Sequence, residues 1–120
     1  MVLPALTPLR KYLNGIHGLE IEGVMCPAYL IADINLHDLE RYQDYIENVP
    51  ALIKRHGGRY QVRGGDVNVL EGDYCPSRLV VLEFPSRVAA LAFYNDPDYE
   101  PYKRLRQSIS DGALVLVEGC

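Results

Sequence analysis

Residues 27–34, PAYLIADI, decide the fold, because they form a short apolar stretch bounded by a proline and an asparagine. Such a stretch predicts a buried strand. Over residues 37–55 the apolar side chains instead recur every three or four positions, at Leu39, Tyr42, Ile46, Val49 and Ile53. This period predicts a helix, which Asp38 would cap and Gly57-Gly58 would end. Pro50 is expected to kink or break that helix.

The remaining predicted elements alternate in the same way. They are strands over residues 59–63, 78–84 and 113–117, and a helix over residues 86–109 that breaks and restarts at Asn95-Asp96-Pro97. The order is therefore β-α-β-β-α-β. This order predicts an α+β, ferredoxin-like domain, with a four-stranded antiparallel sheet and its helices on one face. The other face would stay uncovered and apolar, so we expect a second copy of the chain to cover it in a homodimer.

Composition narrows the class of protein. The chain has 120 residues, of which 48% are hydrophobic and 23% charged, as in an ordinary globular domain. Its formal charge of −4 argues against nucleic acid and anionic membranes as partners, since both need a basic surface. No apolar run approaches the roughly 20 residues of a membrane helix. We expect one compact domain over residues 25–120, preceded by an extension over residues 1–24 with a short helix.

Three cysteines are spread along the chain, at Cys26, Cys75 and Cys120. Their spacing matches no metal-binding pattern, and the histidines form no ligand pair, so no metal site is predicted. An odd, dispersed set of cysteines is typical of reduced thiols in a cytoplasmic protein. The sequence therefore predicts a cytoplasmic location.

Several motifs, taken together and in order, resemble a known family. They are A-Y at 28–29, H-G-G-R-Y at 56–60, R-G-G at 63–65, L-E-G at 70–72, V-L-E-F-P at 81–85 and F-Y-x-x-P-x-Y at 93–99. They resemble the domain-of-unknown-function family number 1330 of the dimeric α/β-barrel superfamily. The resemblance covers residues 25–119 and implies a ferredoxin-like protomer whose sheet pairs with that of a partner. The superfamily includes cofactor-free monooxygenases, isomerase-like enzymes, dye-decolourising peroxidases and ligand-binding domains, so the resemblance implies no single reaction.

Two carboxylates inside apolar strands are candidate catalytic groups. Asp33 shares a strand face with Tyr29, and Glu83 lies within RLVVLEF. A buried carboxylate needs a partner, so one hypothesis is an acid/base pair with Tyr29 as a proton donor. The alternative is structural: Asp33 would cap a turn, and Glu83 would bond to backbone or to an arginine.

Further residues are candidates for binding a substrate. Arg63 and Arg104 could hold an anion, and Tyr94 lies where the second helix breaks. His56 could act as a base, but a histidine at this position more often favours the negative end of a helix.

Two functions follow from these residues. One is an enzyme that acts on a small organic acid or aromatic compound without a metal or organic cofactor, in a cavity of roughly a few hundred cubic ångströms. The other is a non-catalytic module for binding a small ligand or for dimerisation, with both carboxylates bonded and no sizeable cavity.

Overall fold

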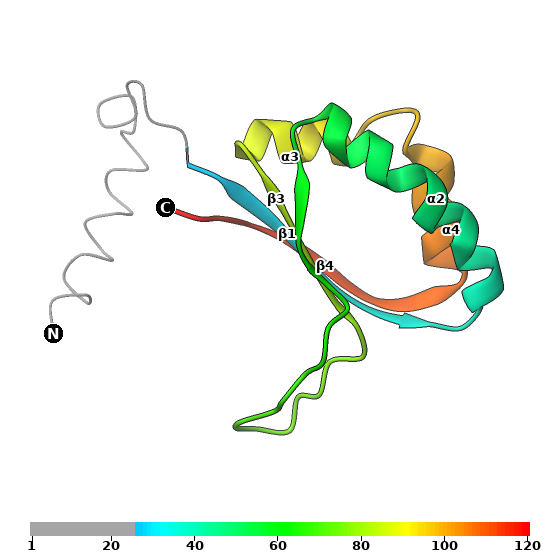
Figure 1. The fold of residues 1–120 in the computed structure, drawn as a ribbon, viewed down its shortest axis with the longest axis vertical. Helices are drawn as coiled ribbons and strands as arrows, with labels where there is room; N and C mark the ends of the chain where they lie inside the picture. Colours follow the sequence, from blue (N-terminus) through cyan, green and yellow to red (C-terminus); the bar gives the residue numbers. More distant parts are fainter. Residues whose placement is uncertain (1–25) are drawn as a thin grey trace, which may run out of the picture.

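The computed structural model describes residues 26–120, and the expected N-terminal extension with its short helix lies outside them. The elements are β1 (Ala28–Leu36), α2 (Leu39–Arg55), β2 (Arg59–Arg63), β3 (Leu79–Phe84), α3 (Arg87–Tyr94), α4 (Glu100–Ser108) and β4 (Ser110–Glu118). The strands form one antiparallel sheet in the order β2-β3-β1-β4, and the helices lie over one face of it (Figure 1). The predicted α+β fold is confirmed.

Strand β1 occupies the middle of the sheet and sets the register of its neighbours. Ala28 lies opposite Phe84 of β3 and opposite Glu118 of β4. Alternate residues of β1 from Ala28 to Ile34 are buried beneath the helices. The residues between them point to the other face, because side chains alternate along a strand. The sheet therefore has an inner face, covered by helices, and an outer face.

Two helices begin at the caps that the sequence predicts. Asp38 accepts a hydrogen bond of 3.0 Å from the backbone N–H of Arg41 at the start of α2. Ser86 accepts one of 3.1 Å from Ala89 at the start of α3. Each cap satisfies one of the backbone donors that a helix start leaves unpaired.

Pro50 does not break α2, which runs without interruption from Leu39 to Arg55. The expected break of the helix is therefore wrong. Proline removes one backbone hydrogen bond, at a cost of about 3 kcal/mol in a helix interior. Its neighbours Val49, Leu52 and Ile53 are buried against the sheet. This packing, rather than local propensity, holds the helix together.

The aromatic part of the core lies where α3 and the start of α4 meet the sheet. The rings of Phe84 and Phe93 have centroids 5.5 Å apart, and those of Phe93 and Tyr99 are 4.4 Å apart. All three side chains are buried. They fill part of the space between helices and sheet, and Phe93 and Tyr99 also border the cavity described below.

The outer face of the sheet carries an apolar strip. Ile31 of β1 lies opposite Val81 of β3 and Val115 of β4. On the edges, Val62 is 40% exposed and Val117 is 46% exposed. Within the described residues no helix covers this face (Figure 1).

Cys26 and Cys120 form a disulfide, with their Cα atoms 5.3 Å apart, so the expectation that all three cysteines are reduced is corrected. The cause is the antiparallel pairing of β1 with β4, which brings the two ends of the domain together. The Gly119 N–H donates to the Pro27 carbonyl at 2.8 Å and extends this pairing. Cys75 is free and exposed. Disulfides are rare in the cytosol, which weakens the ground for a cytoplasmic location. No helix in residues 26–120 is long and apolar enough to cross a membrane.

Candidate functional site

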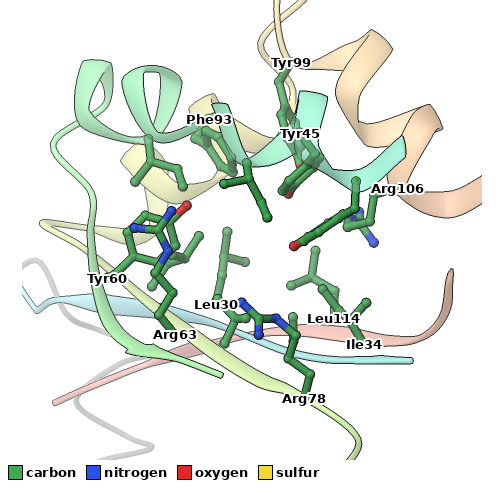
Figure 2. Close-up of a pocket in the computed structure, with 16 residues that line it drawn as sticks. Leu30, Ile34, Tyr45, Tyr60, Arg63, Arg78, Phe93, Tyr99, Arg106 and Leu114 are labelled. Atoms are coloured by element: carbon green, nitrogen blue, oxygen red, sulfur yellow. The ribbon is translucent and has the colours of Figure 1, made fainter. Parts of the chain in front are cut away.

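A cavity of about 80 Å³ lies between the inner face of the sheet and the helices (Figure 2). Leu30, Val80 and Leu114 contribute to its apolar wall on the sheet side. Its polar lining consists of tyrosines and arginines: Tyr42, Tyr45, Tyr60, Tyr99, Arg63, Arg78 and Arg106. The cavity is smaller than the few hundred cubic ångströms expected for an enzyme site, and its polar groups do converge.

Three arginines reach this cavity from different elements. Arg63 ends β2, Arg78 immediately precedes β3, and Arg106 lies in the last turn of α4. No Asp or Glu of the described chain lines the cavity. None of these arginines takes part in an ion pair within residues 26–120, whereas Arg55, Arg59 and Arg104 all do. The cavity therefore carries positive charge that acidic residues of this part of the chain do not neutralise.

Arg78 has one buried side-chain nitrogen. Its Nε is buried and makes no hydrogen bond with the described residues. Gly64 leaves room for the guanidinium: a Cβ at this position would collide with Nη1 of Arg78, and the φ of Gly64 is +73°. A buried donor without a partner costs about 1–3 kcal/mol.

The tyrosine hydroxyls are the other polar groups of the cavity. The hydroxyl of Tyr45 lies 2.7 Å from that of Tyr99. Burial raises the pKa of Tyr45 well above its ordinary value, and the neighbouring Tyr99 adds to the effect. Burial also raises the pKa values of Tyr42 and Tyr60, against the opposing effect of nearby arginines. These phenols stay neutral near pH 7 and can donate hydrogen bonds.

A second, more polar hollow of about 290 Å³ shares Ile34, Arg106 and Leu114 with the cavity. Tyr94, a predicted substrate-binding residue, lines this hollow rather than the cavity. The ammonium of Lys103 lies 3.9 Å from the centre of the Tyr94 ring. Arg106 is thus the charged residue common to both spaces.

Tyr29 and Glu83, two predicted catalytic residues, lie together on the outer face of the sheet. Glu83 accepts hydrogen bonds from Arg59 at 2.7 Å and from Gln61 at 2.6 Å. The Tyr29 hydroxyl donates to Glu83 at 3.3 Å. The hydrogen bond from Arg59 is the main cause that lowers the pKa of Glu83. The structure does not bring this pair to the cavity.

Asp33, the third predicted catalytic residue, organises a loop. Its carboxylate accepts hydrogen bonds from the Tyr74 hydroxyl at 2.6 Å and from the backbone N–H groups of Ser77 at 2.9 Å and Arg78 at 3.3 Å. These bonds lower its pKa, and the one from Tyr74 has the largest effect. Asp33 therefore holds the chain segment that leads into Arg78, but does not line the cavity itself.

Two further predicted residues, His56 and Arg104, also lie outside the cavity lining. The His56 Nε2 lies 2.8 Å from the Asp96 carboxylate, which ties the end of α2 to the turn after α3. This contact is the main cause that lowers the pKa of Asp96 to about 2. Arg104 is 76% exposed and donates to Glu100 one helical turn away. Of the predicted residues, only Arg63 lines the cavity.

Two cavity residues that are not among the predicted site residues could have been found from the sequence. Arg78 has the strand parity of Val80 and Leu82, which face the core. Tyr45 lies one helical turn from Val49, on the face of α2 that packs on the sheet. Arg106 had no comparable signal, because α4 contains no buried residue that would mark its inner face. No cluster of three metal-ligating side chains occurs in the part of the chain that the structure describes.

Two solved structures of the RPA0582 protein share this fold. One is of the methylated protein, and the other is of a protein of unknown function from Rhodopseudomonas palustris. Their TM-scores are 0.67 and 0.66, at 20% and 21% sequence identity. The matches cover 80% and 79% of this chain and 82% and 83% of the relatives.

A third solved structure with this fold is SnoaB, a cofactor-independent oxygenase from Streptomyces nogalater. Its TM-score is 0.54 at 13% identity, and the match covers 79% of this chain and 94% of SnoaB. At these identities the likeness is one of fold. No protein with a curated description matches the sequence.

A family model matches residues 27–120, which is nearly all of the described chain. The resemblance noted in the sequence motifs is thereby confirmed. The chain belongs to the domain-of-unknown-function family DUF1330.

Proposed function

We propose that this protein binds a small organic acid in the cavity between sheet and helices and converts it without a metal or organic cofactor. One observation carries the proposal: Arg63, Arg78 and Arg106 border a single cavity whose lining, within residues 26–120, holds no acidic residue. Arg78 and Arg106 are partly buried, and such cations are costly unless an anion accompanies them. A bound anion would supply the missing charge.

The composition of the walls favours a carboxylate over an inorganic anion. A guanidinium matches the two oxygens of a carboxylate in a bidentate pair, and three guanidinium groups line the cavity. Leu30, Val80 and Leu114 offer apolar contact to a carbon skeleton, which phosphate or sulfate lacks. The cavity of about 80 Å³ is smaller than the roughly 150 Å³ apolar cavity that holds benzene in another protein. The small volume therefore favours an acid of a few carbons.

Conversion of the acid would depend on the paired hydroxyls of Tyr45 and Tyr99. One hydroxyl donates to the other, and the remaining proton is available to an oxygen of the ligand. A neutral phenol at this position can act as a general acid. Cofactor-independent chemistry is supported by the shared fold with SnoaB, which is an analogy of fold alone. Tyr29, Asp33 and Glu83 have no direct catalytic role in this proposal.

The binding proposal is tested by thermal unfolding in the presence of matched ligands. Butyrate is expected to raise the Tm by several degrees at saturation, because a ligand that binds only the native state stabilises it. Butyramide, which has nearly the same shape without the charge, should have no effect. Arg78→Gln should abolish the shift, and Arg104→Gln should keep it, because Arg104 is exposed and bonded to Glu100. If butyrate and the other short acids leave the Tm unchanged, the proposal is overturned.

Binding without conversion is the second candidate function, and one observation favours it. The carboxylates of Asp33 and Glu83, which were candidates for acid/base chemistry, already have their own hydrogen-bond partners. NMR spectra of each bound acid, recorded over hours with and without protein, separate the two functions. New signals that are lost in Tyr45→Phe support the enzyme, and unchanged spectra for every acid that binds support the binding module.

We also propose that the outer face of the sheet joins two copies of the chain. Ile31 and Val81 continue an apolar strip to Val115, which is 54% exposed. A second copy of the same strip would cover it across a two-fold axis. Native mass spectrometry should give twice 13.5 kDa, and Val115→Glu should give monomers. Val88→Glu, at a residue of α3 that is 76% exposed, should remain dimeric. A monomeric wild type at micromolar concentration would disprove the dimer.

A further inference from the structure

The cationic groups of the cavity form two sets that come from two different parts of the fold. Arg63 and Arg78 come from the β2–β3 side of the sheet, and Arg106 comes from α4 (Figure 2). In this view Arg106 lies on the opposite side of the cavity from Arg63, with Tyr45 between them. A ligand that meets both sets must therefore present an acceptor at each end.

The first set is held in place by its surroundings. The guanidinium carbon of Arg63 lies 4.1 Å from the centre of the Tyr60 ring. Gly64, between the two arginines, makes room for Arg78, whose Nε has no hydrogen-bond partner in the described chain. Guanidinium groups that line the same cavity can bind the oxygens of one carboxylate.

The second set combines a charge with neutral donors. Arg106 lines the cavity together with Tyr45 and Tyr99, whose hydroxyls are 2.7 Å apart. Because one hydroxyl donates to the other, the pair still has one proton to offer to a ligand oxygen. A guanidinium beside a phenol donor is suited to an oxygen that bears negative charge. A neutral methyl group there would leave Arg106 without a counter-charge, which is unfavourable in a partly buried site.

We infer that the ligand is a short dicarboxylate that spans the cavity from the Arg63–Arg78 side to Arg106. This inference rests on the proposed function and specifies the class of acid. Two negative charges neutralise the charge of three arginines better than one negative charge does. The cavity volume of about 80 Å³ and the adjoining hollow that shares Arg106 favour a chain of a few carbons. The second hollow, which also borders Arg106, offers space beside the distal carboxylate.

The test compares acids that differ only in the second carboxylate. Dissociation constants of succinate and butyrate, and of malonate and propionate, are measured by titration calorimetry at constant ionic strength. Each dicarboxylate should bind about tenfold more tightly than its partner of the same length, which corresponds to about 1.4 kcal/mol. Arg106→Gln should weaken succinate binding much more than butyrate binding and thereby remove this preference. Arg106→Lys, which keeps a cation, should retain part of the preference.

Control variants separate this inference from the proposed function. Arg78→Gln should weaken both members of a pair, whereas Arg104→Gln, which removes a charge from the exposed face of the same helix, should weaken neither. Equal affinities for succinate and butyrate in the wild type would overturn the inference and leave the proposed function standing. The inference is also overturned, and the proposed function still stands, if Arg106→Gln weakens the binding of both acids equally. It is likewise overturned if the Arg106→Gln variant still prefers the dicarboxylate. Failure of all four acids to bind would overturn both.

Discussion

The carboxylate of Asp33 and the guanidinium of Arg78 lie on opposite faces of the sheet, yet one hydrogen bond joins these two residues. Asp33 Oδ1 accepts from the backbone N–H of Arg78 at 3.3 Å, while the Arg78 side chain extends into the cavity (Figure 2). Tyr74 and Ser77 donate to the same carboxylate. Asp33 thus fixes the point from which the Arg78 side chain departs.

Replacement of Asp33 should therefore weaken ligand binding without any direct contact. Asp33→Asn is expected to raise the Kd for butyrate about threefold to tenfold, because the loop that carries Arg78 loses its charged acceptor. Calorimetry measures the change. Asp73→Asn, at an exposed carboxylate of the same loop, should leave the Kd unchanged. An unaltered affinity in Asp33→Asn would contradict this positioning role.

Gly64 offers a test of the space around Arg78. Gly64→Ala should both destabilise the protein, by about 1–2 kcal/mol for an alanine at positive φ, and weaken butyrate binding, because the new Cβ displaces the guanidinium. Two other glycines separate these effects. Gly72→Ala, also at positive φ but with open space around it, should lower stability alone. Gly65→Ala, with open space and no positive φ, should change neither. Denaturant titration and calorimetry give the two quantities, and normal butyrate affinity in Gly64→Ala would refute the steric role.

The contact between His56 and Asp96 predicts a specific response to acid. The pKa of Asp96 is lowered to about 2 in the folded state, whereas the unfolded chain titrates near the ordinary value of about 3.9. Between these values the unfolded state binds more protons, so the stabilisation present above about pH 4 is lost as the pH falls toward 2. Asp96→Asn should be less stable at pH 6 and should show a shallower fall of Tm between pH 4 and 2. Parallel Tm curves for the two proteins would exclude this linkage.

The disulfide between Cys26 and Cys120 should contribute measurably to stability. It closes a loop with a sequence separation of 94 residues, for which the chain-entropy model gives about 4–5 kcal/mol. In a Cys75→Ser background, dithiothreitol should lower the free energy of unfolding by up to this amount. Cys26→Ser should reproduce the loss and make the protein insensitive to the reductant. Two reactive thiols in the untreated Cys75→Ser variant would show that the bond does not form.

The sequence predicted the sheet and helices well because the local signals agree with the tertiary packing. PAYLIADI and RLVVLEF fall within or next to the central strands β1 and β3, and Asp38 and Ser86 cap helices as expected. Pro50 was misjudged because its local cost is smaller than the gain from burying its neighbours.

The candidate site was harder to predict because it depends on which face of the sheet each polar residue meets. Parity grouped Tyr29 with Asp33 correctly, but the sequence does not say which of the two faces the helices cover. Glu83 is a predicted catalytic group because it is a charge in an apolar strand. Strand β3 also has an outer face, where Glu83 lies beside Arg59. Arg106 is placed by the packing of α4 on the sheet, which is not encoded in any short motif.

The meeting of Cys26 with Cys120 means that residues 26–120 make up an almost closed ring of chain. The two ends lie 5.3 Å apart between Cα atoms, so a short linker can join them, and new ends can be opened elsewhere. A suitable opening is the exposed stretch 66–72, which lies in no helix or strand and leaves Tyr74 through Arg78 attached to Asp33. A circular permutant opened there should fold and keep its arginine-lined cavity. Its new termini would lie in the loop between β2 and β3, and the joined residues 26 and 120 would lie in the interior of the chain.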